Sequence, residues 1–223
     1  DIHAGGEDLI FPHHENEIAQ SEAANGKEFA RYWMHNGFLN IDNRKMSKSL
    51  GNFFTVREIS EKYDLQVLRF FMLSAHYRSP LNFSAELMEA AKRGLERIVN
   101  SASNLKFLVQ NSSAEKMTEE ENRMFEETSE YVKDFERAMD DDFNTADAIA
   151  AIFDLVKYIN THTDENSSKE YLEKLHKRLS DLADVLGVIV DKDEEILDED
   201  IEALIRERQD ARKEKNFARA DQI

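Results

Sequence analysis

Apolar residues recur at helical spacing over the second half of the chain, and this pattern constrains the fold more than any other feature. Residues three or four positions apart lie on one face of an α-helix, and such a face is usually buried against other helices. The 7 glycines and 2 prolines among 223 residues leave few turn signals for an all-β architecture. A mainly helical fold is therefore expected. The first stripe consists of Leu87, Ala91, Leu95, Ile98, Ala102, Leu105 and Leu108.

Capping residues divide this region into helices. A Ser, Thr or Asn side chain at a helix start can accept a hydrogen bond from a free backbone N–H. The second helix is expected to run unbroken through Met139, and the fourth to run to Leu186, with Gly187 as its C-terminal cap. Short polar linkers favour an antiparallel bundle. The predicted N-caps are Ser84, Thr118 (with Glu121 in a capping box), Asn144 and Ser168.

The first third of the chain is more mixed. Pro12 suits the first position of a helix, where a missing N–H costs nothing, and this helix is expected to run to Ala24. A short strand is expected between His35 and Asp42. Two further helices are predicted, one after the capping box at Thr55 and one after Asp64.

The charge is unevenly distributed. A net charge of −17 argues against binding to nucleic acid, but basic residues gather between Arg44 and Arg78 and again between Arg206 and Arg219. Such patches can hold a polyanion locally, although a solvated surface explains them equally well. The chain has no cysteine, which excludes disulfides and thiolate metal sites within it. No apolar run approaches the roughly 20 residues of a membrane span, so a soluble protein without membrane contact is expected.

The stretch KMSKSLGN, residues 45–52, has the chemistry of a phosphate-binding loop. Two lysines three positions apart can follow negative charge as it moves onto a leaving pyrophosphate. Ser47 offers a short hydrogen-bond donor, and Gly51 permits a hinge. Isolated pairs of lysines at this spacing are common on protein surfaces, but the whole eight-residue run is much more specific.

A second stretch, FPHHENE at residues 11–17, offers metal ligands. His13 and Glu17 are four positions apart and would share a face of the predicted helix. Imidazole and carboxylate are ordinary zinc ligands, but two ligands do not complete a site, and a contact on the helix surface is the simpler alternative. Gly5 and Gly6 precede this stretch and could let the backbone approach a ligand, while Asp8 could accept hydrogen bonds from a ribose or an ammonium group.

Several stretches resemble the cysteinyl-tRNA synthetase family. KMSKS is identical to the signature of class I aminoacyl-tRNA synthetases. Five further stretches are similar to cysteinyl-tRNA synthetases specifically: DIHAGGEDLIFPHHENEIAQS (1–21), residues 32–52, HYRSP (76–80), DDDFNTADA (140–148) and the tail 206–221. The resemblance implies the second half of a Rossmann-type α/β catalytic domain over residues 1–54, with the KMSKS loop. A stem-contact helical linker (55–83), a tRNA-binding helical bundle (84–190) and the start of a C-terminal, anticodon-contacting region (191–223) would follow.

The resemblance also implies the reaction and its residues. Cysteine and ATP, with Mg²⁺, would form cysteinyl-adenylate, and cysteine would then pass to its tRNA. Catalysis would rest on Lys45 and Lys48, and zinc, held in part by His13 and Glu17, would bind the substrate thiol. His3 and Asp8 would line the substrate pocket. The residues implied in ATP binding are Lys45, Met46, Ser47, Lys48, Gly5, Gly6 and Asp8.

The family's HIGH motif, the first half of its Rossmann fold and its two zinc-binding cysteines do not occur in these 223 residues. The chain is therefore expected to be a piece of a longer cytoplasmic, monomeric enzyme, inactive and without tight zinc binding in isolation. Two alternatives remain. One is a related cysteine ligase with an amino-sugar acceptor, and the other is a non-catalytic helical module that binds RNA or protein.

Overall fold

The structure is a computed structural model that describes residues 1–42, 44–46, 54–188, 190 and 219. The chain divides into two compact units, Asp1–Val190 and Asp191–Ile223. Of the C-terminal region expected over residues 191–223, the structure describes residue 219 alone. No helix among the described residues is both long and apolar enough to cross a membrane.

The N-terminal strand, β1 (Ile2–Gly6), pairs in parallel with β2 (Tyr32–Asn36). Between them lie a 3-10 turn (η1, Glu7–Leu9), a π-turn (η2, Ile10–His14) and helix α1 (Glu15–Asn25). The predicted start at Pro12 agrees with the backbone dihedrals: Phe11 is the one residue of η2 with a non-helical conformation (φ −130°, ψ 132°), and His14 is already α-helical (φ −64°, ψ −36°). The helix ends at Gly26, whose left-handed φ of 61° needs no Cβ.

A second sheet has the strand order β4-β3-β5. β3 (Leu39–Ile41) pairs antiparallel with β4 (Arg44–Lys45) and parallel with β5 (Leu81–Phe83). The single strand expected between His35 and Asp42 is therefore two strands, β2 and β3, in different sheets. The break falls at Gly37, whose N–H donates to the Tyr77 carbonyl instead of to a strand.

Two short helices connect the sheet to the long ones. The Thr55 capping box is confirmed at the start of α2 (Val56–Ser60), and Asp64 caps α3 (Leu65–Leu73) by accepting the N–H of Gln66 at 2.8 Å. Phe70 and Phe71 of α3 are buried and pack with the helices that follow. Helix α3 thus joins the sheet region to the helical region through one continuous apolar core.

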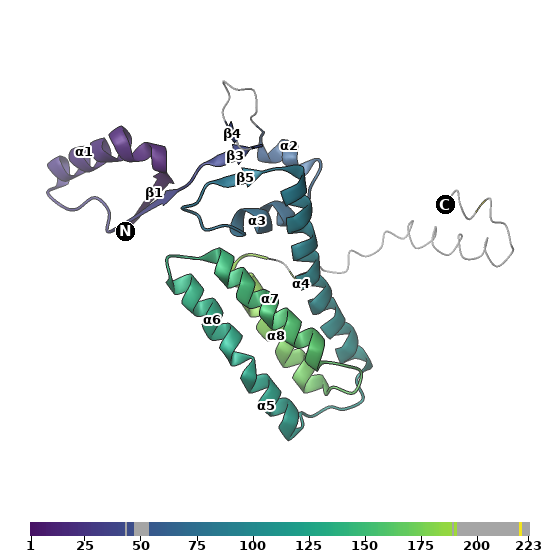
Figure 1. The fold of residues 1–223 in the computed structure, drawn as a ribbon. Helices are drawn as coiled ribbons and strands as arrows, with labels where there is room; N and C mark the ends of the chain where they lie inside the picture. Colours follow the sequence, from purple (N-terminus) through teal and green to yellow (C-terminus); the bar gives the residue numbers. More distant parts are fainter. Residues whose placement is uncertain (43, 47–53, 189, 191–218, 220–223) are drawn as a thin grey trace. The chain divides into compact units, whose positions relative to one another are not determined.

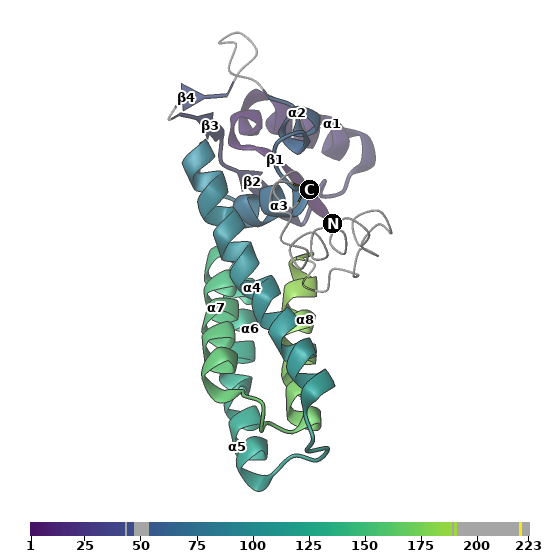
Figure 2. The same ribbon diagram turned by 90° about the vertical axis from the view of Figure 1, so that its right-hand side faces the viewer.

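Five helices form the rest of the unit: α4 (Ala85–Asn111), α5 (Glu119–Glu127), α6 (Ser129–Asp140), α7 (Thr145–His162) and α8 (Lys169–Val185). Helices α4, α7 and α8 pack side by side, and α6 lies against α7 (Figures 1 and 2). Each fully buried leucine or isoleucine stabilises this packing by about 1.5–3 kcal/mol. The buried side chains include Ile98, Leu105, Ile152, Leu155, Ile159, Leu172, Leu175 and Leu179.

The predicted N-caps at Ser84, Thr118, Asn144 and Ser168 are all confirmed, each accepting a backbone N–H. Gly187 follows α8 with a φ of 63°, as expected of a C-terminal cap. Two details are wrong. Leu87 is 43% exposed and Met88 is buried in its place, and the helix expected to continue through Met139 breaks at Thr128 into α5 and α6.

Candidate functional site

The candidate site is built on the parallel pair β1 and β2. His3 lies opposite Trp33, and Gly5 lies opposite His35. Because side chains alternate along a strand, His3 and Gly5 project from one face of β1, and Trp33 and His35 share a face of β2. The pairing therefore gathers two imidazoles and an indole on one surface.

His14, from the π-turn before α1, completes this aromatic cluster. Its ring lies 4.9 Å from the His3 ring and 5.0 Å from the His35 ring, measured between centroids. His14 Nδ1 is 2.8 Å from His35 Nε2, so one of these two nitrogens carries the shared proton. His14 is only 4% exposed, which makes it the buried centre of the cluster.

Gly5 has a clear steric role in this arrangement. A Cβ at position 5 would lie 3.0 Å from both Cε1 and Nε2 of His14. Any larger residue would press on the imidazole, so glycine allows His14 to approach the strand closely. Gly6 is similarly close to its neighbour, since a Cβ there would lie 2.6 Å from Oδ1 of Asp8. Asp8 itself is in the 3-10 turn η1 and is exposed.

Three side chains in this cluster have converging metal-ligand atoms. Nitrogen atoms of His3 and His14 and a carboxylate oxygen of Glu17 all lie within 4.8 Å of one another. His3 Nε2 is 2.7 Å from Glu17 Oε2. Two imidazoles and one carboxylate are a donor set that fits a zinc ion with one position left for another ligand. In the described part of the chain, this is the one such group of three or more.

His13 does not belong to this group. It is exposed in the π-turn, and the backbone bond from Glu15 N–H to the Ile10 carbonyl spans five residues there. The non-helical residue of the π-turn is Phe11, which precedes both His13 and Glu17, so their four-residue spacing still allows a shared helix face, but His13 is not among the side chains whose ligand atoms converge with Glu17. The structure thus brings Glu17 together with His3 and His14, and leaves His13 outside the cluster.

The KMSKSLGN stretch (residues 45–52), called the lysine motif below, begins at the edge of the second sheet. Lys45 is the last residue of β4 and lies opposite Asn40 of β3, and the Met46 N–H donates to the Leu39 carbonyl at 3.0 Å. Ser47 and Lys48, to which ATP contacts were assigned from the sequence, lie outside the described residues. The described part of the motif is therefore anchored to β3 by backbone hydrogen bonds.

Sequence reasoning missed His14, Trp33 and His35 as members of the site. Period-two spacing of Trp33 and His35 within an apolar, aromatic run could have placed both on one strand face. The convergence of His14 on His3 could not have been found this way, because it depends on the π-turn and on the parallel pairing of β1 with β2.

Comparison with known proteins gives two family matches. Residues 1–93 match the family of tRNA synthetases class I (C) catalytic domain, and residues 134–190 match the DALR domain. Two solved structures share the fold over 84% of this chain. One is LeuRS of Agrobacterium radiobacter K84 in a ternary complex with tRNA and LeuAMS, with a TM-score of 0.67 and 20% identity, and the match covers 27% of that chain. The other is methionyl-tRNA synthetase of Mycobacterium tuberculosis with methionyl-adenylate, with a TM-score of 0.56 and 17% identity, and the match covers 40% of that chain.

Curated relatives are much more similar in sequence. The Cysteine--tRNA ligase of Lachnospira eligens is 66% identical over all 223 residues of this chain, which correspond to 47% of that protein. The enzymes of the same name from Lachnoclostridium phytofermentans and Clostridioides difficile are 57% and 55% identical, again over the whole chain and over 48% of each relative. The chain spans about half the length of these relatives. Over its whole length the chain is thus similar to part of the cysteine--tRNA ligases, and it carries the class I catalytic and DALR matches.

Proposed function

We propose that the complete protein ligates cysteine to its cognate tRNA through a cysteinyl-adenylate, with ATP and Mg²⁺ as the second substrate. The observation that carries the proposal is 55–66% identity to cysteine--tRNA ligases over every residue of this chain. The intact KMSKSLGN run at residues 45–52 adds to it, because a binding module has no chemical need for a phosphate-handling lysine pair.

The four segments expected from the sequence become parts of this proposal. Residues 1–54 would be the second half of a Rossmann-type catalytic domain, and residues 55–83 a linker that contacts the acceptor stem. Residues 84–190 would form an antiparallel bundle that supports the tRNA, and residues 191–223 would begin the C-terminal region. The parallel pairing of β1 with β2 and the packing of α4, α7 and α8 support this division.

In the proposed mechanism, residues of this chain act by binding and electrostatics. Lys48 and Lys45 would neutralise the charge that develops on the leaving pyrophosphate, and Met46 and Ser47 would contact ATP beside them. Gly5, Gly6 and Asp8 would help to bind the nucleotide. His3 and Asp8 would line the amino-acid side of the pocket. No protein nucleophile is needed, because the carboxylate of cysteine attacks the α-phosphate directly when both are held in place.

Zinc is proposed as the cofactor that selects cysteine. When bound, a zinc ion would supply a soft Lewis acid with a preference for the thiolate of cysteine over the hydroxyl of serine. Two ligand sets in this chain compete for the role. The set implied by the family resemblance consists of His13 and Glu17. The set whose ligand atoms converge in the structure consists of His3, His14 and Glu17.

The proposed partners are cysteine tRNA, cysteine and ATP, and the enzyme is proposed to act in the cytoplasm as a monomer without membrane contact. A related ligase that passes cysteine to an amino sugar is the second candidate. The DALR match over residues 134–190 favours the tRNA acceptor, because a sugar needs no additional helical surface.

The test is amino-acid-dependent exchange of pyrophosphate into ATP by the full-length protein, across all twenty amino acids. Exchange with cysteine alone is the expected result, and cysteine transfer to tRNA instead of to an amino sugar would separate the two candidates. Replacement Lys48→Ala is expected to lower kcat of the exchange by about 10²–10³-fold, as loss of one preorganised charge on a reacting group does. Lys133→Ala, a change of the same kind on an exposed lysine of α6, is the control. Equal rates in the two variants would contradict the role of Lys48.

A further inference from the structure

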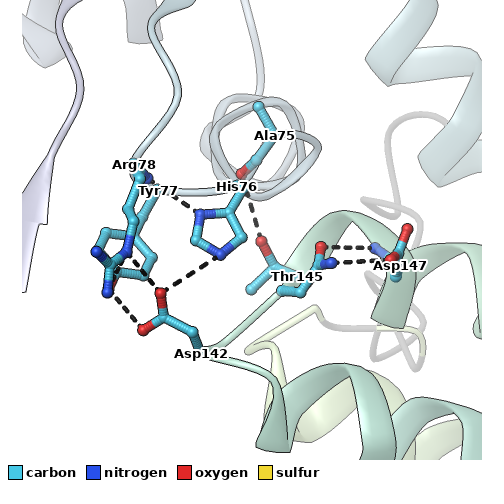
Figure 3. Close-up of polar contacts among 8 residues, drawn as sticks. Ala75, His76, Tyr77, Arg78, Asp142, Thr145 and Asp147 are labelled. Atoms are coloured by element: carbon cyan, nitrogen blue, oxygen red, sulfur yellow. Dashed lines mark hydrogen bonds and ion pairs between the residues drawn. The ribbon is translucent and has the colours of Figure 1, made fainter.

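The turn between α3 and β5 is clamped by the loop between α6 and α7. Asp142 of that loop accepts a hydrogen bond from the Tyr77 hydroxyl at 2.7 Å and one from Arg78 Nε at 2.5 Å, using a different carboxylate oxygen for each. His76 Nε2 lies 3.8 Å from the second oxygen. Figure 3 shows the three side chains of the turn directed at this one carboxylate. We call these four residues the Asp142 clamp.

The charge of Asp142 and the tautomer of His76 both favour the contacts of the Asp142 clamp. Hydrogen bonds from Arg78 and Tyr77 outweigh the small effect of burial and lower the pKa of Asp142, so its carboxylate is ionised near neutral pH. The backbone N–H of Arg78 donates to His76 Nδ1 at 3.2 Å, which places the ring hydrogen of a neutral His76 on Nε2, the atom that faces Asp142. All three turn side chains therefore present hydrogen to the same anion.

The loop that supplies Asp142 is held rigidly. Asp142 and Phe143 have φ values of 57° and 55°, a left-handed conformation that Asp tolerates but that is costly for Phe143 and persists there only where the surroundings enforce it. The Phe143 N–H donates to the Met139 carbonyl, and Thr145 Oγ1 donates to the Leu73 carbonyl at 2.8 Å. The start of α7 is thus bonded directly to the end of α3. Figure 3 shows the same Thr145 hydroxyl beside the clamp, directed at the Ala75 carbonyl.

On its other side, the clamped turn lies against the strand that leads to the lysine motif. The Tyr77 carbonyl accepts the Gly37 N–H at 2.8 Å, and the Phe38 carbonyl accepts the Leu81 N–H at 2.9 Å. A Cβ at Gly37 would lie 2.5 Å from the carbonyl carbon of Ser79, so the two backbones are in direct contact. Phe38 immediately precedes β3, which pairs with β4 and so with Lys45.

We propose that Asp142 is a positioning residue for the lysine motif. By holding residues 76–78 against the start of α7, it fixes the turn on which Gly37 and Phe38 rest, and with it the β3–β4 pair that carries Lys45. Asp142 touches no substrate in this role. It links the helical region to the strand that ends at Lys45, and the consequence for catalysis rests on the proposed function.

The structural part of the proposal is tested on this chain by hydrogen–deuterium exchange. Asp142→Asn keeps a residue that tolerates a positive φ but replaces one acceptor oxygen by a donor group, so one of the two bonds from Tyr77 and Arg78 loses the oxygen that receives it. Backbone amides of residues 37–46 and 77–81 are expected to exchange at least 5-fold faster, with α8 unchanged. Asp141→Asn removes the same charge one residue away and is the control. Unchanged exchange at residues 37–46, or an equal rise in α8, would overturn the proposal.

The catalytic part is tested on the full-length protein by cysteine-dependent pyrophosphate exchange. Asp142→Asn is expected to lower kcat by about 5- to 10-fold and to leave KM for cysteine unchanged, because the β3–β4 pair that carries Lys45 is no longer held in place while the cysteine pocket is intact. Arg78→Met should lose as much, Arg78→Lys should retain most of the rate, and the double variant Asp142→Asn/Arg78→Met should lose no more than either single change.

The two proposals fail in different ways. Absence of cysteine-dependent exchange by the wild-type protein would refute the proposed function, and the hydrogen-exchange result on this chain would still decide whether the clamp holds the β3–β4 pair. Normal exchange by the wild type together with the same kcat in Asp142→Asn, or an equal fall in Asp141→Asn, would refute the positioning role alone.

Discussion

Among single residues, Glu121 carries an unusual share of the contacts between helices. Its two carboxylate oxygens accept the backbone N–H groups of Thr118 at 2.8 Å and Ser168 at 2.7 Å, which are the N-cap residues of α5 and α8. Burial alone would raise the pKa of Glu121, but the hydrogen bonds from Ser168 and Thr118 outweigh it and lower the pKa. One carboxylate therefore joins two helix starts.

Replacing Glu121 by glutamine should destabilise the fold by about 1–3 kcal/mol, because the amide has one acceptor oxygen for donors that lie on two sides. Urea unfolding at neutral pH measures the loss. Glu173→Gln, an exposed change of the same kind on α8, is the control and should have little effect. Equal stability of the two variants would mean that the Glu121 contacts contribute nothing net.

The lowered pKa of Glu121 also predicts how its contribution depends on pH. A carboxyl group whose folded pKa lies below the unfolded value of 4.5 stabilises the protein fully above that value. This stability is lost as pH falls from 4.5 through the folded pKa, since the folded state must then take up a proton that the unfolded state already holds. The difference in unfolding free energy between wild type and Glu121→Gln should therefore shrink below pH 4.5, and a constant difference would contradict the assignment.

At the candidate site, the sequence indicated histidine and carboxylate side chains as possible ligands, but it indicated only in part which of them lie together. Glu17 and His3 were named from the sequence, and the structure joins them at 2.7 Å. His14 was not named, because its contact with His3 depends on the pairing of β1 with β2 and on the turn that follows β1. The spacing of two residues along a chain cannot reveal such a contact between elements, and the ligand role of His13 stays a prediction.

Among the elements, the break between α5 and α6 shows how tertiary contacts override a continuous apolar pattern. The Thr128 hydroxyl donates to the Phe125 carbonyl at 2.7 Å, and Arg178 of α8 donates to the same carbonyl at 2.8 Å and to the Thr128 hydroxyl. The guanidinium also lies over the Phe125 ring, 3.8 Å from its centroid. A side chain 53 residues away in the sequence thus satisfies a carbonyl at the break.

Replacing Arg178 by methionine should cost about 1–3 kcal/mol, since two hydrogen bonds to the break and one cation–π contact are lost while much of the apolar stem remains. Thermal or urea unfolding measures this. Lys177→Met, which removes the neighbouring exposed cation and its pair with Asp181, is the matched control. An equal loss of unfolding free energy in the two variants would mean that removal of a positive charge, and not loss of the contacts with Phe125 and Thr128, causes it.

The caps at Ser84, Asn144 and Ser168 were predictable because each depends on a side chain and a backbone N–H three residues away at most. Strand β5 was not predicted, because its three residues become a strand only by pairing with β3, some 40 positions earlier. The same holds for the division of the predicted strand 35–42 at Gly37, which depends on contact with the turn near Ser79. The capping signals were read correctly, and the long-range pairing of strands was not.

At the scale of the whole molecule, the net charge of −17 has the same sign as the charge of the proposed tRNA partner. A polyanion would be repelled by the chain as a whole and attracted only where basic residues gather. Exposed Arg57 and Lys62, at α2 and just after it, belong to the basic stretch between residues 44 and 78. Lys133 and Lys177, by contrast, are exposed on α6 and α8, where each is paired with an acidic residue.

The affinity of this chain for cysteine tRNA should therefore fall steeply with salt, and the slope should depend on where charge is removed. Each phosphate contact contributes roughly −0.7 to −0.9 to the slope of log K against log salt. The double change Arg57→Gln/Lys62→Gln should make that slope shallower by about 1–2, whereas Lys133→Gln/Lys177→Gln, with the same change in net charge, should leave it as it is. Fluorescence anisotropy with labelled tRNA between 50 and 300 mM salt measures both. Identical slopes for the two variants would show that net charge governs binding, and a flat wild-type slope would remove residues 44–78 from the proposed interface.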